Sequence, residues 1–132
     1  MKKVYELKMF TIVVLGFIFS AFQPLQTTAC EIDFEVVENQ KEVYDVGDII
    51  VIKVSVTLTH RSCPIGMDQT KFTMTGLEVL GATDWTQLST MVWERKVKVK
   101  VQKTKKGNLV FNAVRTCDKD GGFGSIKLFA KQ

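Results

Sequence analysis

The sequence has one histidine, two prolines and three cysteines in 132 residues. A single histidine excludes a two-histidine copper centre within one molecule and leaves any Ser–His–Asp set dependent on His60. The chain also has no nucleophile elbow, no phosphate-binding loop, no dinucleotide fingerprint and no CxxCH haem motif. We therefore expect a protein that is not an enzyme and that carries no cofactor.

Only one long apolar run is present. It covers residues 9–22 (MFTIVVLGFIFSAF), follows Lys2, Lys3 and Lys8, and precedes a polar exit at residues 23–29. These three zones are typical of a secretory signal. The run is shorter than the roughly 20 residues of a membrane-spanning helix. We expect residues 1–29 to be a signal peptide and residues 30–132 to be one domain exported to the periplasm or outer surface. An uncleaved anchor is the alternative.

The residues before Cys30 fit signal-peptidase cleavage. Ala29 and Thr27 are small residues at the first and third positions before the cut. A cysteine directly after the cut resembles the lipoprotein signal of bacteria, in which that cysteine is acylated, although Thr27 stands where that family has leucine. The resemblance implies a lipid on Cys30. A lipid there, or an uncleaved signal, would be the protein's link to a membrane.

Cys63 and Cys117 are the other two cysteines. If Cys30 carries lipid, they can form one disulfide; otherwise one thiol is free or pairs between molecules. Each follows a strand-like run and precedes a turn-rich one, so we prefer a Cys63–Cys117 bridge, which would stabilise the fold by about 2–4 kcal/mol. Two buried, unpaired thiols are the alternative, which an oxidising compartment disfavours.

Charge is modest. The formal net charge is +4, and it falls to +2 when the three lysines and one glutamate of the leader are removed. This balance is too mild to predict nucleic-acid binding.

Alternation of apolar and polar residues dominates the rest of the chain and predicts strands. We expect strands at 32–37, around 43–46, at 49–58, at 72–80 with a bend at its glycines, at 83–89, at 92–102, at 109–117 and at 125–130. Residues 103–107 are expected to be a hairpin turn that pairs 92–102 with 109–117. Alternation places Ile50, Ile52, Val54, Val56 and Leu58 on one face of the strand at 49–58, and Trp93, Arg95, Val97, Val99 and Val101 on one face of the strand at 92–102. Phe111 and Ala113 are expected on the core face of the strand at 109–117.

Seven or so strands in about 100 residues predict an all-β fold, an antiparallel β-sandwich. The stretch from Tyr44 to His60 (YDVGDIIVIKVSVTLTH) resembles the opening of bacterial immunoglobulin-like domains, in which a Gly-Asp turn leads into a strand of alternating Val and Ile. The chain departs from antibody domains because no tryptophan lies about midway between Cys63 and Cys117 in the expected strand, although Trp85 and Trp93 both lie between these cysteines. The resemblance implies an immunoglobulin-like sandwich of about seven strands behind a signal-peptide helix, and such exported domains bind, space or assemble.

Two loops, 60–67 and 118–124, hold the residues that we single out for function. Phe123 lies between two glycines and is expected to be an exposed contact. A Cys63–Cys117 bridge would join both loops into one surface. We therefore predict a binding or assembly module with a protein partner in the cell envelope. Its expected contact residues are His60, Arg61, Met67, Asp118, Asp120 and Phe123.

A small redox or metal protein is the alternative function. His60, Cys63, Met67 and Cys117 are ligand types that copper or haem uses, but their order in the chain differs from that of the cupredoxins. A labile thiol–disulfide exchange partner is a further option. Asp118 to Gly121 resembles the start of a calcium loop, yet the later acidic ligands are missing.

A stripe of lysines marks the strand expected at 92–102. Alternation places Lys96, Lys98 and Lys100 on one solvent-facing side, and Lys103, Lys105 and Lys106 follow. We interpret the stripe first as protection of an edge strand against aggregation. The alternative is contact with an anionic headgroup or an acidic partner.

Overall fold

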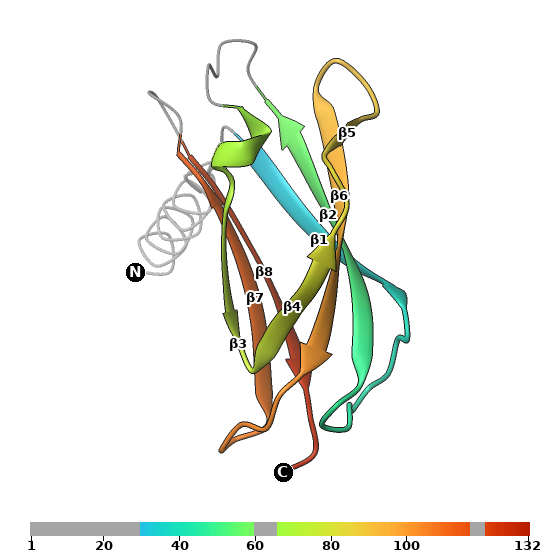
Figure 1. Cartoon of the computed structure of the whole chain (residues 1–132). Helices are drawn as coiled ribbons and strands as arrows, with labels where there is room; N and C mark the ends of the chain where they lie inside the picture. The colour runs from blue at the N-terminus through green and yellow to red at the C-terminus, as the bar shows by residue number, and fades with distance from the viewer. Residues whose placement is uncertain (1–29, 60–65, 117–120) are drawn as a thin grey trace, which may run out of the picture.

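The computed structural model describes residues 30–59, 66–116 and 121–132. These residues form eight β-strands and one short 3-10 helix, arranged as two antiparallel sheets (Figure 1). The all-β prediction is confirmed, while the expected signal helix lies outside the described residues. The elements are β1 (Cys30–Glu38), β2 (Ile49–Leu58), η1 (Met67–Gln69), β3 (Lys71–Thr75), β4 (Leu77–Ala82), β5 (Thr86–Gln87), β6 (Val92–Val101), β7 (Asn108–Arg115) and β8 (Gly122–Phe129).

The larger sheet has five strands. Its order is β1-β2-β6-β4, and β5 also pairs with β6. The smaller sheet has the order β3-β7-β8. All pairs between these strands are antiparallel.

Alternation along the strands fills the space between the sheets. Phe111 of β7 packs against Phe34 and Phe72, with ring centroids 5.0 and 5.3 Å apart. A fully buried aliphatic side chain contributes about 1.5–3 kcal/mol, so these rows supply the main force that holds the sheets together. Fully buried, as predicted, are Ile50, Ile52, Val54 and Val56 of β2, Val97, Val99 and Val101 of β6, and Phe111 and Ala113 of β7.

The predicted hairpin between β6 and β7 is wrong. β6 pairs with β2, β4 and β5, whereas β7 pairs with β3 and β8 in the other sheet. Each strand has one mostly apolar face, and Val99 and Phe111 on these faces are both 0 % exposed. Two such faces bury more apolar surface when they lie opposite each other across a core than when they lie side by side.

The predicted strand 72–80 is two strands in different sheets. Gly76 separates β3 from β4 at a φ of 71°, in the left-handed region that glycine adopts without strain. A Cβ on Gly76 would lie 2.5 Å from Thr104 Cγ2 and 2.7 Å from Leu109 Cδ2. Gly76 therefore makes the corner at which the chain passes from the small sheet to the large one.

The glycines at 122 and 124 lie in β8 and not in a turn. A side chain at either position would face the core. A Cβ on Gly122 would lie 2.6 Å from the carbonyl oxygen of Cys30, and a Cβ on Gly124 would lie 2.5 Å from the carbonyl oxygen of Ile32. The absence of these side chains lets β1 pack directly on β8 and closes this side of the sandwich. Phe123, between them, points away from the core.

The segment predicted as a strand around 43–46 forms one isolated bridge. Tyr44 pairs in parallel with Ala130: its N–H donates to the Phe129 carbonyl, and its own carbonyl accepts from the Lys131 N–H, both at 2.8 Å. Tyr44 is 0 % exposed. The chain between β1 and β2 therefore joins the large sheet to the end of β8.

The lysine stripe lies on a central strand. β6 is hydrogen-bonded to β2 on one side and to β4 and β5 on the other. The edge-protection interpretation of Lys96, Lys98 and Lys100 is therefore wrong, because a strand that is paired on both sides has no open edge to protect. Among the described residues, no helix is long and apolar enough to cross a membrane.

Candidate functional site

Both predicted loops leave from one end of the sandwich. Cys30 pairs with Leu58, so β1 begins where β2 ends, and Arg115 pairs with Gly122, so β7 ends where β8 begins. Gly122 packs against the Cys30 backbone and brings these two pairs together. We call this end, the upper one in Figure 1, the loop end; it is defined by Cys30, Leu58, Gly66, Arg115 and Gly122.

Several predicted site residues lie outside the described part of the chain. They include both cysteines of the predicted bridge and most members of the predicted contact and metal sets. The bridge and the metal alternative therefore stay predictions. These residues are His60, Arg61, Cys63, Cys117, Asp118 and Asp120.

Arg115 connects the bases of the two loops. Its Nη1 donates to the carbonyl oxygen of Gly66 at 3.1 Å and to Thr70 Oγ1 at 2.7 Å. Arg115 is only 1 % exposed and Thr70 9 %. A buried charge is tolerated only where polar groups surround it, so Arg115 fixes η1 and its flanks against the end of β7.

The sequence interpretation missed Arg115 and Thr70. The signal for Arg115 was present, because the inward alternation Leu109, Phe111, Ala113 reaches residue 115 at the next step. An arginine at a core-facing position near a strand end can bury its stem and keep its guanidinium at the rim. Thr70 had no comparable signal, since its contact forms only once β3 and β7 have paired.

Met67 and Phe123 have different environments at this end. Met67 begins η1, is partly buried and packs against the hydrophobic core. Phe123 is 62 % exposed, as the sequence predicted, although it lies in β8. Of the two predicted contacts, Phe123 is therefore the one whose side chain is mostly exposed to solvent.

A second exposed apolar side chain lies at the same end. Leu88 is 57 % exposed in the turn between β5 and β6, where its N–H donates to the Val92 carbonyl at 2.9 Å. The same turn is joined to β2 by a 2.7 Å bond from the Leu58 N–H to the Met91 carbonyl. The loop end thus presents Leu88 and Phe123 on opposite sheets.

Cys30 is a free, buried cysteine at the first position of β1. It is 1 % exposed, and β1 is paired from its first residue. Within the described ranges, no cluster of three or more His, Cys, Asp or Glu side chains could hold a metal ion.

An ion pair that shifts the pKa of both of its partners lies away from the loop end. Asp48 Oδ2 accepts hydrogen bonds from Lys41 Nζ and from the Asp45 backbone N–H, both at 2.9 Å. The Lys41 bond, and then the Asp45 bond, lower the pKa of Asp48 below 3.8, and the same pair raises the pKa of Lys41. These groups stabilise the turn before β2 and form no part of the candidate site.

No protein-family model matches the chain, and neither curated proteins nor solved structures show a significant match. The function of the loop end is therefore argued from its own geometry.

Proposed function

We propose that the chain is an exported, non-enzymatic immunoglobulin-like module that binds or assembles with a protein partner of the cell envelope through loops 60–67 and 118–124. The observation that carries this proposal is the contact of Arg115 with Gly66. It holds the base of the first loop against the base of the second, so two segments far apart in the sequence can form one surface.

Strand order supports the immunoglobulin-like assignment. In constant-type immunoglobulin domains, strands A-B-E-D face strands C-F-G. The order β1-β2-β6-β4 against β3-β7-β8 is the same when these seven strands are lettered in chain order. The two loops then correspond to the B–C and F–G loops, which contact ligands in variable domains; this correspondence is an analogy of fold.

Site-specific crosslinking in the host envelope tests the binding surface. Photoreactive benzoylphenylalanine would replace Phe123 in one variant and Phe129 in another. Phe129 is a matched control because it is 56 % exposed and lies at the far end of the same strand. We expect a discrete protein adduct from position 123 and none from position 129.

The partner identified in this way allows a binding measurement. Phe123→Asp should weaken its affinity by about 30-fold, the effect of a typical hot-spot residue, while Phe129→Asp leaves it unchanged. Equal crosslinking at both positions, or equal affinities of the two variants, would refute the loop end as the contact surface.

Intact mass of the protein recovered from its host tests export and lipidation. We expect cleavage before Cys30 and, without reductant, a mass lower by two hydrogen atoms than with it, from the Cys63–Cys117 bridge. The burial of Cys30 argues against acylation, because a lipid on this thiol would require the first residue of β1 to leave the sheet. Recovery with residues 1–29 attached would contradict the proposed export by cleavage.

A further inference from the structure

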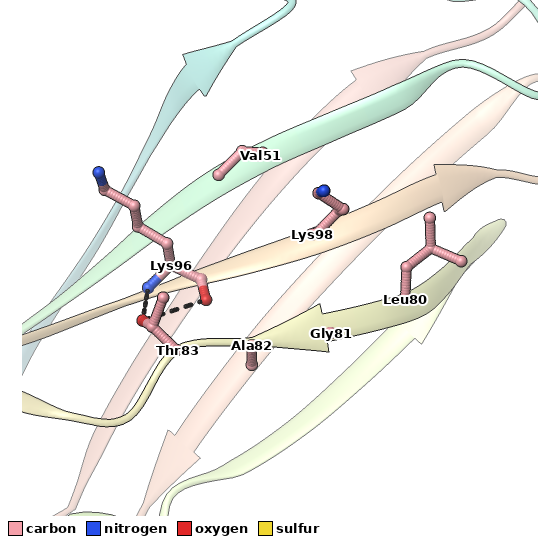
Figure 2. A pocket seen from close by; sticks show the side chains of 7 residues that line it. All are labelled: Val51, Leu80, Gly81, Ala82, Thr83, Lys96 and Lys98. Atoms are coloured by element: carbon pink, nitrogen blue, oxygen red, sulfur yellow. Dashed lines mark hydrogen bonds between the residues drawn. The ribbon is translucent and has the colours of Figure 1, made fainter.

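A hollow of about 340 Å³ lies on the outer face of the large sheet, away from the loop end. Figure 2 shows it between β2, β6 and β4. Its size is within the range of small-molecule pockets, roughly 300–1,000 Å³. The residues that line it are Val51, Leu80, Gly81, Ala82, Thr83, Lys96 and Lys98.

A β-bulge in β4 creates the hollow. Val79 pairs with Val99 and Gly81 with Lys98, so Leu80 is an extra residue between two pairs. Gly81 contributes no side chain, and a Cβ built there would meet nothing within 4 Å. Leu80 is 46 % exposed beside this gap. Bulges that redirect side chains in this way often lie beside binding sites.

The floor of the hollow is apolar and one side of it is basic. Val51 lies opposite Lys98 on β2, and Gly81 lies opposite Lys98 on β4. The backbone of Lys96 is fixed by hydrogen bonds to Thr83, but in the described part of the chain neither Lys96 nor Lys98 forms an ion pair. The neighbouring Lys53, in contrast, pairs with Glu35.

Because β6 is a central strand, the two lysines have no role in protecting an edge. We propose that the hollow binds a small amphipathic anion, a soluble molecule in which a short apolar group adjoins a phosphate or a carboxylate. The apolar group occupies the space over Gly81, between Leu80 and Val51. The anionic group pairs with the ammonium groups of Lys96 and Lys98. This site is independent of the loop end.

Titrations of the protein, produced through its own leader, with defined probes test the site. The probes are decyl phosphate, decanoate and, as a cationic counterpart, decyltrimethylammonium, each below its micelle concentration. We expect both anions to bind and to shift the amide NMR signals of Val51, Gly81 and Lys98, and the cation not to bind. Added salt should weaken the binding, because exposed charges are screened.

Two variants and a control distinguish the contribution of the lysine charges to binding from that of the shape of the hollow. Joint Lys96→Gln and Lys98→Gln substitutions should weaken binding about tenfold, the combined effect of two exposed ion pairs. Gly81→Leu should abolish it by filling the space. Joint Lys103→Gln and Lys105→Gln substitutions remove the same charge from the exposed segment after β6 and should leave the affinity unchanged. Melting curves confirm that each variant folds.

Three results would overturn the proposal. They are an absence of binding at millimolar probe, equal binding of the cationic probe, and an equal loss of affinity in the Lys103 and Lys105 control. Binding to phosphatidylglycerol vesicles without binding to monomeric decyl phosphate would also overturn it, since that result assigns the lysines to a membrane surface.

Discussion

Arg115 occupies a position where the residue pattern calls for an apolar side chain. It is among the largest fully buried side chains of the described residues. An aliphatic residue of similar length would bury as much surface without the cost of desolvating a charge. The guanidinium instead fixes the path of the chain, because its hydrogen bonds to Gly66 and Thr70 determine how the chain enters β3.

Replacing Arg115 tests this role. Arg115→Met should lower the free energy of unfolding by about 1–3 kcal/mol, since it leaves Thr70 Oγ1 and the Gly66 carbonyl without this donor. Urea unfolding measures the change. In a double-mutant cycle with Thr70→Val, we expect a coupling of about 0.5–3 kcal/mol. Strictly additive effects would show that Arg115 and Thr70 act separately.

At the scale of strands, the local residue pattern predicts well where strands occur and predicts poorly which strands pair with each other. Alternation predicts the observed bounds of β2 and the inward-facing residues of β2, β6 and β7, because the two-residue period of a half-buried strand is visible in a short stretch of sequence. The assignment of β7 to β6 failed, since which strands become neighbours depends on the packing of the whole core. The prediction of a turn at Gly122 and Gly124 is wrong because glycine is favoured both in tight turns and in strands that pack closely against another backbone, and the sequence alone does not distinguish these two roles.

The candidate site divides in the same way. The exposure of Phe123 follows from its own flanking residues and was predicted. The approach of Gly66 to Arg115 requires β3 to pair with β7, and the hollow over Gly81 requires the bulge in β4 to lie beside β6. Neither arrangement can be derived from a short stretch of sequence.

The contact of β1 with β8 gives a prediction at this scale. Gly124→Ala places a Cβ 2.5 Å from the Ile32 carbonyl oxygen and should destabilise the protein by about 1–3 kcal/mol, the usual effect of overpacking. Gly81→Ala is the matched control, since it meets nothing within 4 Å. Thermal melting should distinguish the two variants. Equal melting temperatures would mean that β1 does not pack against β8 as described.

For the whole molecule, acid should weaken the fold through Asp48. Its pKa in the folded state lies below 3.8, chiefly because of Lys41 and then of the Asp45 N–H. The unfolded chain therefore takes up this proton first as the pH falls. The stabilisation is present above pH 3.8 and is lost as the pH falls through the lower, folded value.

Urea unfolding at pH values from about 2 to about 6 measures this loss. Asp48→Asn should flatten the acid side of the stability profile. Asp33→Asn, at an exposed position of β1 that forms no ion pair within the described ranges, should leave that slope as it is. If the Asp48→Asn variant loses stability with falling pH as steeply as the original protein does, the Lys41–Asp48 pair is not the cause of that loss.

The parallel bridge of Tyr44 would contribute to the resistance of the molecule to tension. Cys30 lies at the loop end, and the C-terminus lies at the opposite end of the long axis (Figure 1). A pull between these points acts along the strands, so the two bonds that Tyr44 makes with Phe129 and Lys131 are strained together and cannot open one after the other. If it were held at Cys30 and pulled from its C-terminal end, the sandwich would therefore resist stretching at the end opposite the loop end.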